Sequence, residues 1–477
     1  MGNLIQPFLI LPEIALGALI LVLFVLDLLL PAAQKGCLGA VTTGGFAIAL
    51  VLAIAGYGVT GSSFSGAYVD DPISLFFKAF FLLCALIVTI MSREYITRFD
   101  RGIGEFYILI TLATLGMIVL SAAANLLVLF VALELVTLSF YVLTSYHHQQ
   151  ERSLEAGTKY LILGALSSAI LLYGISFLYG ATGSVDFSAI AHAARTNPSA
   201  TLLTLGLVLV LGGVGFKIAC VPFALWVPDV YQGAPTPVTA FLSVGSKAAG
   251  FVILLRLLSG MFASMQDQWI GPVCVLSAMT IFYGNLGALW QVNIKRLLGY
   301  SSIGHAGYLL IGIAAASPLG ASAVVFYLAA YLFTNLAAFL VVVVVARRVE
   351  AEEIATFNGL AQRSPFLAAC MFLALLSLAG VPPLAGFVGK FLLLLAAVNS
   401  GLIWLAIVGA INVVISLYYY LMIINAMYFR APETQEPILI HPMTKAALLA
   451  CLAGILGLGL ASEPFLRLAM AAVQPLF

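Results

Sequence analysis

The chain has 477 residues, of which 63% are hydrophobic and only 8% are charged. Because soluble domains carry about 25% charged residues, this composition excludes a soluble globular protein and indicates a polytopic membrane protein. The net charge of +1 provides no basic field for a nucleic acid. The six cysteines lie far apart without a CxxC pair, so they do not indicate a zinc site, an iron–sulfur cluster or a disulfide framework.

Apolar runs long enough to cross a membrane occur along the whole chain. A helix needs about 20 apolar residues to cross the hydrocarbon layer, and this length predicts about fourteen spans. The segment before the first run has no basic residue, so we expect a retained span and not a cleaved signal. The predicted spans are 8–30, 37–59, 73–92, 105–121, 125–146, 155–180, 202–224, 235–258, 271–291, 298–316, 321–346, 365–398, 402–429 and 446–470.

Lysine and arginine collect in alternate loops. Thirteen follow odd-numbered spans and three follow even-numbered spans. Since basic residues favour the cytoplasmic side, the odd loops are predicted to be cytoplasmic and both chain termini to face the opposite side of the membrane. The thirteen are Lys35, Arg93, Arg98, Arg101, Arg152, Lys159, Lys295, Arg296, Arg347, Arg348, Arg363, Arg430 and Lys445, and the three are Arg195, Arg256 and Arg467.

Four charged side chains fall inside predicted spans, away from loops and helix ends. They are Glu134, near mid-bilayer in span five, and the lysines Lys217, Lys247 and Lys390; His305 is a fifth ionisable group. Each charge costs at least about 2.5 kcal/mol to insert. One glutamate cannot neutralise three lysines, so static ion pairs do not account for the set. Because desolvation favours the neutral form of a lysine, these residues are predicted to be proton-transfer sites.

Span seven contains prolines close to its buried lysine. Pro222 and Pro228 follow Lys217, and a proline cannot bond to the carbonyl four residues back. Backbone groups left free within a membrane are tolerated where they line a cavity or are bonded by neighbours. We therefore expect span seven to be broken at these prolines.

Span twelve also has prolines close to its buried lysine: in SLAGVPPLAGFVGKF, Pro382 and Pro383 precede Lys390. Matched interruptions in two halves of a transporter indicate a transport site. Spans seven and twelve run in opposite directions, which predicts an inverted repeat of spans 4–8 and 9–13.

No loop is long enough for a soluble domain, so we expect one membrane domain over residues 1–477. Its predicted parts are three N-terminal helices (1–104), a first five-helix repeat (105–258), an inverted second repeat (271–429) and a C-terminal helix (446–470).

Four long stretches are similar, in order, to a known family. Through them the chain resembles, over nearly its whole length, the antiporter-like membrane subunits of respiratory complex I, the NADH:quinone oxidoreductases. The resemblance implies fourteen helices in two inverted five-helix units, with helices seven and twelve broken. It also implies a central polar axis that maps onto Glu134, Lys217, Lys247, His305 and Lys390. The stretches are KYLILGALSSAILLYGISFLYGATGS (159–184), VPFALWVPDVYQGAPTPVTAFLSVGSKAAGF (221–251), KRLLGYSSIGHAGYLL (295–310) and GVPPLAGFVGKF (380–391).

The resemblance implies a subunit of a proton-translocating enzyme that has no redox site of its own. In the expected mechanism, Lys217 holds its proton while the ionised Glu134 is close. When Glu134 is drawn away, Lys217 passes the proton through Lys247 and His305 to Lys390, which releases it to the outer side. Freed carbonyls and trapped water at the helix breaks are expected to supply part of the hydrogen-bonded path.

The same resemblance implies a bacterial inner membrane, whose periplasmic side both chain termini then face, and the partners and cofactors of the assembly. We expect the lipid bilayer, the antiporter-like subunit M and the small subunits K, J, A and H as neighbours, and no nucleic acid. FMN, iron–sulfur clusters and quinone are expected in other subunits, and no cofactor or metal in this chain. The GxG pairs of the sequence lack the strand and helix context of a dinucleotide-binding fold.

Other functions stay open at this point. A subunit of a cation/proton antiporter shares the fold and the lysines, although sodium prefers oxygen ligands and the chain has one central carboxylate. A subunit of a membrane-bound hydrogenase, or of an oxidoreductase with another electron donor, is also compatible because the donor binds elsewhere. A purely structural scaffold does not need three lysines at mid-membrane depth. The electron-transfer centres that co-purify with the chain discriminate between these alternatives.

Overall fold

The computed structural model describes residues 9–98, 102–349, 352–432 and 436–477. Within these residues, 13 helices are long and apolar enough to cross a membrane, and two shorter apolar helices together occupy predicted span twelve. The predicted class, an all-α polytopic membrane protein, is confirmed. Residue 8 of the first predicted span and the loop arginine Arg101 lie outside the described residues.

The first part of the chain adds a small strand pair to the predicted helices. In this hairpin Gly61 pairs with Asp70 and Ser63 with Tyr68, in antiparallel register. The helix that follows begins at a capping box, in which Asp71 and Ser74 bond each other's backbone N–H groups. The elements are α1 (Leu11–Leu29), α2 (Leu38–Ala55), β1 (Gly61–Ser63), β2 (Tyr68–Asp70) and α3 (Pro72–Tyr95).

The middle of the chain contains spans four to eight. The eighth span is continuous over Thr236–Met261, but it includes two π-helical turns, Leu242–Ser246 and Leu255–Met261. The elements are α4 (Ile103–Ser121), α5 (Leu126–Thr144), α6 (Glu151–Thr182), α7 (Phe187–Thr196), α8 (Thr201–Ile218), α9 (Val227–Gly233), α10 (Thr236–Phe241) and α11 (Lys247–Leu254).

The last part of the chain differs from the prediction at its end. The sequence predicts a final span over 446–470, but the helix ends at Leu460, and a separate helix begins at Ser462 after the non-helical Ala461. The elements are α12 (Gln266–Ala288), α13 (Ile294–Ala314), α14 (Pro318–Val349), α15 (Leu360–Arg363), α16 (Pro365–Ala379), α17 (Ala385–Asn399), α18 (Ile403–Phe429), α19 (Pro442–Leu460) and α20 (Ser462–Val473). Short 3-10 turns cover Ala32–Cys37, Phe64–Gly66, Ile96–Arg98, Ala263–Met265, Ile354–Phe357 and Gln474–Leu476.

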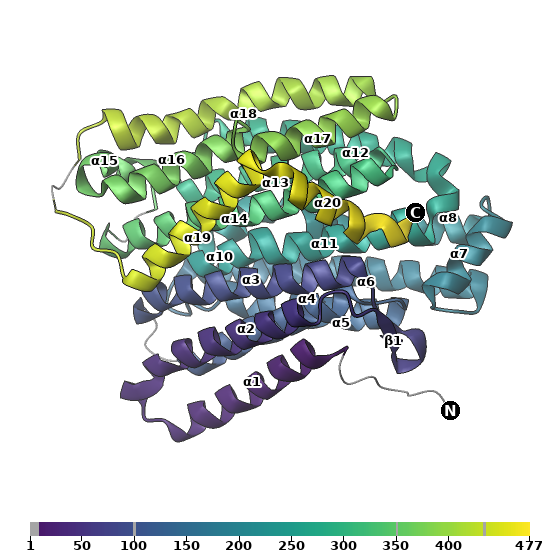
Figure 1. Cartoon of the computed structure of the whole chain (residues 1–477), viewed down its shortest axis with the longest axis horizontal. Helices are drawn as coiled ribbons and strands as arrows, with labels where there is room; N and C mark the ends of the chain where they lie inside the picture. The colour runs from purple at the N-terminus through teal and green to yellow at the C-terminus, as the bar shows by residue number, and fades with distance from the viewer. Residues whose placement is uncertain (1–8, 99–101, 350–351, 433–435) are drawn as a thin grey trace.

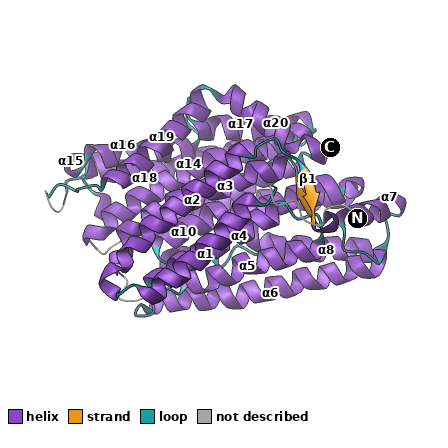
Figure 2. Cartoon of the chain, turned by 60° about the horizontal axis from the view of Figure 1, so that its bottom comes forward, coloured by secondary structure: helices purple, strands orange, loops and turns teal. Residues whose placement is uncertain are grey.

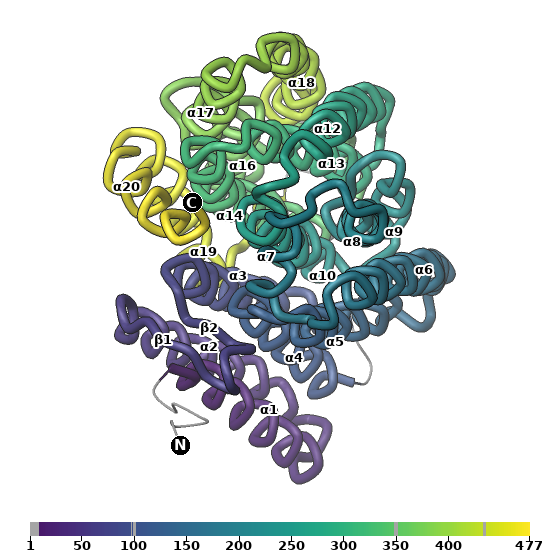
Figure 3. Tube along the Cα trace, turned by 90° about the vertical axis from the view of Figure 1, so that its right-hand side faces the viewer, coloured from purple at the N-terminus to yellow at the C-terminus, as the bar shows by residue number. Residues whose placement is uncertain are grey.

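The long helices lie alongside one another in a single bundle. Helices α1 and α2 form one side of it, and α17 and α18 form the opposite side (Figure 1). In the view along the helices, α14 lies in the middle of the bundle (Figure 3). The strand hairpin, the beginning of α1 and the end of α20 lie at the same end (Figures 1 and 2). This is the end that the positions of lysine and arginine predict to face the periplasm.

Burial increases from the sides of the bundle toward its centre. The span Thr236–Met261 and helices α13 and α14 are almost entirely enclosed by other helices. Outer helices instead expose apolar side chains, such as Leu28 on α1 and Val414 on α18. Exposed apolar faces suit lipid or neighbouring membrane subunits. The enclosed helices have no contact with water, so their polar side chains must find partners inside the protein.

The two broken spans end in the same way. Helix α8 ends at Ile218 and α16 ends at Ala379, each four residues before a proline, Pro222 or Pro383. The ring of a proline clashes with the carbonyl four residues back, so it prevents the helix from continuing through that point. The Val221–Pro222 and Pro382–Pro383 peptide bonds are both cis.

Each of these helix ends is closed by a Schellman motif, a pair of backbone hydrogen bonds around a left-handed residue. The left-handed residues are Ala219 and Gly380, with φ of 60° and 88°. The matched ends confirm that spans seven and twelve are interrupted, while the inverted repeat of 105–258 and 271–429 stays a prediction. The bonds run from Ala219 N–H to the Phe216 carbonyl, from Cys220 to Gly215, from Gly380 to Ser377 and from Val381 to Leu376, at 3.0 to 3.1 Å.

One predicted break is wrong. Pro228 lies in the first turn of α9, which begins at Val227. N–H groups in the first turn of a helix make no hydrogen bond within the helix, so a proline there removes none, and its fixed φ suits the helix. Pro228 therefore starts a helix, and Pro222 alone accounts for the interruption of span seven.

Candidate functional site

Lys217 lies at the end of α8 and faces α5. Its side chain is buried, and its Nζ donates a hydrogen bond to Oγ1 of Thr137. Glu134 lies one turn before Thr137 on α5, and its Oε1 accepts a hydrogen bond of 2.5 Å from Ser168 Oγ on α6. Glu134 and Lys217 thus border the same interior region, but no ion pair within 4.0 Å joins them in the described structure.

Lys247 lies between the two π-helical turns of the eighth span and binds α13. Its Nζ donates a hydrogen bond of 2.5 Å to the carbonyl of Ser302 and a second bond to the Ser302 hydroxyl. That hydroxyl also lies 3.4 Å from the hydroxyl of Tyr231. Because π-helical turns insert an extra residue and are frequent at functional sites, the turn before Lys247 is a structural reason for the direction of its side chain.

The eighth span passes close to the end of α8 at Gly250. A Cβ at position 250 would lie 2.7 Å from Cγ2 of Ile218 and 3.5 Å from Cβ of Lys217. Only a residue without a side chain fits this approach. Since Gly250 is one turn from Lys247, the backbone segments that carry Lys217 and Lys247 are packed directly together.

His305 on α13 is held between two tyrosines. Its Nδ1 lies 2.6 Å from the hydroxyl of Tyr327 on α14, and its Nε2 lies 3.0 Å from the hydroxyl of Tyr420 on α18. The Tyr420 hydroxyl is also hydrogen-bonded to the hydroxyl of Ser301. Both ring nitrogens of His305 therefore have partners that can donate or accept a proton.

Lys390 on α17 binds the broken end of α16. Its Nζ donates hydrogen bonds of 2.8 Å and 3.1 Å to the carbonyls of Leu378 and Ala379. Such terminal carbonyls have no partner within their own helix and carry the negative end of its dipole, so they favour a cation. The ammonium also lies 4.8 Å from the ring centroid of Tyr308 on α13.

Helix α13 connects the two lysines of the second half. Ser302, His305 and Tyr308 follow one another at intervals of one helical turn and so lie on one face of α13. Ser302 binds Lys247, and Tyr308 contacts Lys390, with His305 between them. A line of polar side chains therefore runs from Lys247 to Lys390 along a single buried helix.

None of the three central lysines forms an ion pair within the described part of the chain. No carboxylate oxygen lies within 4.0 Å of the Nζ of Lys217, Lys247 or Lys390. Each amine instead contacts hydroxyl or carbonyl oxygens. A static ion pair is thus not what holds these side chains, and their amines can exchange a proton without separating a salt bridge.

Among the described residues, sequence reasoning missed three further buried cations. Lys78 was not recognised, although it lies within predicted span three, whose apolar neighbours were the available signal. Arg256 and Lys295 were counted among the loops, but both belong to buried helices and form ion pairs. The hydroxyl partners of the site were missed because most come from helices distant in the sequence; they are Thr137, Ser168, Ser302, Tyr327 and Tyr420. Over the residues that the structure describes, no group of three or more His, Cys, Asp or Glu side chains is placed to hold a metal ion.

The fold and the buried polar line define an antiporter-like membrane subunit. A family model described as "NADH:quinone oxidoreductase/Mrp antiporter, TM" matches residues 123–416, which include all five predicted site residues. NADH-quinone oxidoreductase subunit N of Moorella thermoacetica is 42% identical over 466 residues, covering 98% of each chain. The chain belongs to the family of NADH-quinone oxidoreductase subunit N.

Solved structures agree with this assignment. A chain of respiratory complex I from Thermus thermophilus superposes with a TM-score of 0.83 at 35% identity, covering 96% of this chain and 99% of that chain. A chain of the Mrp complex from Dietzia sp. DQ12-45-1b superposes with a TM-score of 0.86 at 22% identity, covering 99% and 98%. The second likeness shows the fold alone.

Proposed function

We propose that this chain translocates protons across the membrane as a subunit of an NADH:quinone oxidoreductase, through Glu134, Lys217, Lys247, His305 and Lys390. The observation that carries the proposal is the face of α13 that links Lys247 to Lys390 through Ser302, His305 and Tyr308. Among the described residues the three lysines have no carboxylate partner, which supports the proposal because their protons are not held by ion pairs.

The first transfer involves Glu134 and Lys217. The ionised Glu134 stabilises a proton on Lys217 when the two side chains approach. Ser168 holds Glu134 and Thr137 holds Lys217, so both groups keep a neutral partner after they separate. A charge change in a neighbouring subunit that draws Glu134 away would release the proton of Lys217 toward the eighth span, whose Gly250 packs against the end of α8 one turn from Lys247.

The later transfers use α13 and the break in span twelve. Lys247 passes the proton by way of Ser302 and water to His305, whose ring can take it at one nitrogen and release it at the other. Lys390 then receives it, and the end carbonyls of α16 stabilise the charged amine until the proton leaves on the outer side.

The chain works as part of a larger membrane assembly. The family assignment supports neighbours of the complex I type, namely the antiporter-like subunit M and the small subunits K, J, A and H. FMN, iron–sulfur clusters and quinone belong to other subunits, where the electron transfer that drives the pump takes place. The bacterial relatives support a bacterial inner membrane, and the alternation of lysine and arginine between loops supports both chain termini on its periplasmic side.

The proposal is tested with Lys217→Met in the whole complex reconstituted into vesicles. Methionine keeps the length and apolar stem of lysine but cannot carry a proton. We expect fewer protons translocated per quinone reduced, or a loss of turnover where pumping and electron transfer are tightly coupled. Lys445→Met is the matched control, because Lys445 is exposed outside the central line. Unchanged turnover with the full proton stoichiometry in Lys217→Met would overturn the proposal.

A further inference from the structure

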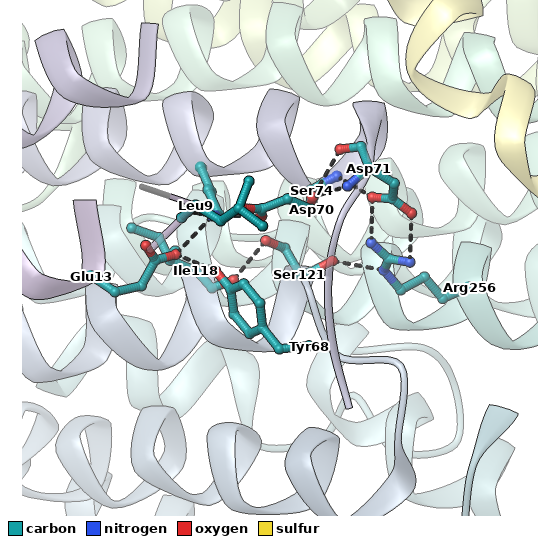
Figure 4. Close-up of polar contacts among 10 residues, drawn as sticks. Leu9, Glu13, Tyr68, Asp70, Asp71, Ser74, Ile118, Ser121 and Arg256 are labelled. Atoms are coloured by element: carbon teal, nitrogen blue, oxygen red, sulfur yellow. Dashed lines mark hydrogen bonds and ion pairs between the residues drawn. The ribbon is translucent and has the colours of Figure 1, made fainter. Parts of the chain in front are cut away.

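A second group of buried charges lies apart from the central line, at the end of the bundle that carries the strand hairpin. Lys78 on α3 is its centre. The Nζ of Lys78 lies 2.6 Å from Oδ1 of Asp70 on β2 and 3.0 Å from Oε1 of Glu13 on α1. It also donates a hydrogen bond of 3.2 Å to the carbonyl of Leu9. Figure 4 shows Glu13 and Asp70 together with their neighbours from the hairpin and α4.

The group is enclosed. The side chains of Lys78 and Asp70 are each 1% exposed, and that of Glu13 is 9% exposed. A cavity of about 20 Å³ beside Asp70 and Lys78 is otherwise lined by apolar side chains and glycine, and it has room for about one water molecule. Bulk water therefore has little access to these charges.

The charges do not balance if both carboxylates are ionised. Within the described residues, two carboxylates face one ammonium, which leaves an excess negative charge in an apolar setting. The nearby Arg256 does not correct this, because its guanidinium binds both oxygens of Asp71 at 2.8 Å and 3.0 Å. A buried charge without a partner costs several kcal/mol, so the group gains stability by taking up a proton.

Two oxygens of the group are open to that proton. Oδ2 of Asp70 and Oε2 of Glu13 are buried and have no hydrogen-bond partner in the described structure. The other oxygen of Glu13 accepts a hydrogen bond of 2.5 Å from the Tyr68 hydroxyl. Glu13 also lies in the first turn of α1, where the helix dipole favours a negative charge. Asp70 has neither of these stabilising contacts.

We propose that Glu13, Asp70 and Lys78 form a proton-binding site separate from the central line, and that Asp70 holds the proton. Lys78 then pairs with the ionised Glu13, and the group is neutral. Its members come from α1, β2 and α3, so the proton helps to hold these three elements together.

Five charged or titratable groups surround Asp70 among the described residues. They are Glu13 from α1, Tyr68 from the hairpin, Asp71 directly before α3, Lys78 within α3, and Arg256 from the eighth span. Burial raises the pKa of Asp70 above its usual value, and Lys78 opposes that rise only in part. For an acid with a raised pKa, the stabilising contribution is full below the unfolded pKa and is lost as the pH rises through the folded pKa.

The site is tested by infrared difference spectra of the whole complex, recorded in H₂O and in D₂O. A protonated carboxyl gives a C=O band that shifts in D₂O, whereas lipid esters do not. We expect one such band to be lost in Asp70→Asn, and also in Glu13→Gln, because Lys78 can then pair with an ionised Asp70. Asp229→Asn is the matched control: Asp229 faces two cations, Lys159 at 2.6 Å and Arg296 at 2.5 Å, so its removal should leave the band intact.

A second measurement covers the case in which a variant assembles poorly. The thermal midpoint of the wild-type complex should fall more steeply with rising pH than that of Asp70→Asn, which has no proton to lose at this position. A band that persists in Asp70→Asn, or equal pH dependence in the two complexes, would overturn the site. Both readouts concern the resting complex, so they do not depend on the route through the central lysines.

Discussion

At the scale of single residues, the three central lysines are held by oxygens that carry no full charge. Lys217 binds a threonine hydroxyl, Lys247 a serine, and Lys390 two backbone carbonyls. Such partners accept a hydrogen bond from either form of the amine. The sequence was sufficient to single out the lysines, because a charge within an apolar run is visible in the chain itself. It did not reveal the partners, which come mainly from other helices.

The two hydroxyl contacts of His305 lead to a prediction about Tyr420. Tyr420→Phe removes the hydroxyl that lies between Ser301 and His305 and leaves one ring nitrogen without its partner. Loss of such a buried partner costs about 1–3 kcal/mol, so proton translocation coupled to quinone reduction should slow about tenfold. The exposed Tyr418 on the same helix provides the control Tyr418→Phe. Equal translocation rates in the two variants would contradict a role for the Tyr420 hydroxyl.

At the scale of elements, the ends of α8 and α16 show how proline and a left-handed residue act together. The end of each helix, four residues before the proline, was predictable from the chain because the clash of the proline ring is local. The groups that the freed carbonyls bind were not predictable from the chain. At α16 they bind Lys390, whereas at α8 the lysine turns away from its own helix end toward Thr137. That difference depends on which helix is packed beside each break.

The left-handed residues of the two ends predict opposite effects of matched substitutions. Gly380→Ala places a side chain at φ 88°, with its Cβ 3.1 Å from Cδ of Lys390, and should destabilise the complex by about 1–2 kcal/mol. Ala219→Gly relieves the strain of a side chain at φ 60°, which the chain entropy of glycine offsets only in part, and should stabilise the complex by about 0.5–1 kcal/mol. The measurement is the thermal midpoint of the purified complex. Shifts of the same sign would show that backbone conformation does not limit stability at these ends.

At the scale of the whole molecule, buried ion pairs join parts of the chain that are far apart in sequence. Arg256 at the end of the eighth span binds Asp71 before α3 and the carbonyl of Ser121 on α4. At the other end of the bundle, Lys295 of α13 lies 3.0 Å from Glu352. The positions of these cations in the chain resemble those of ordinary loop residues. Their burial follows only from the packing of the helices.

The contact between Arg256 and Asp71 makes a prediction about the joining of the N-terminal helices to the bundle. Asp71→Ala leaves a buried guanidinium without its carboxylate and should destabilise the complex by about 3–5 kcal/mol, measured as a lower thermal midpoint. Adding Arg256→Met should recover part of the loss, because the unpaired charge is then absent. Glu463→Gln, which breaks the exposed pair of Glu463 and Arg467, is the control and should change the midpoint little. A similar midpoint for Asp71→Ala and Glu463→Gln would refute this role.

The sequence by itself determined the membrane class, the spans apart from the end of the last one, the two interruptions and the five central ionisable groups. Each of these depends on local properties of the chain, namely hydropathy, proline chemistry and the cost of a charge in an apolar run. Tertiary structure alone decided that Lys390 binds the end of α16, that α13 links Lys247 to Lys390, and that Lys78 meets two carboxylates. These contacts join side chains to groups on other elements, and they form only because the packed interior leaves buried polar groups no water to bind.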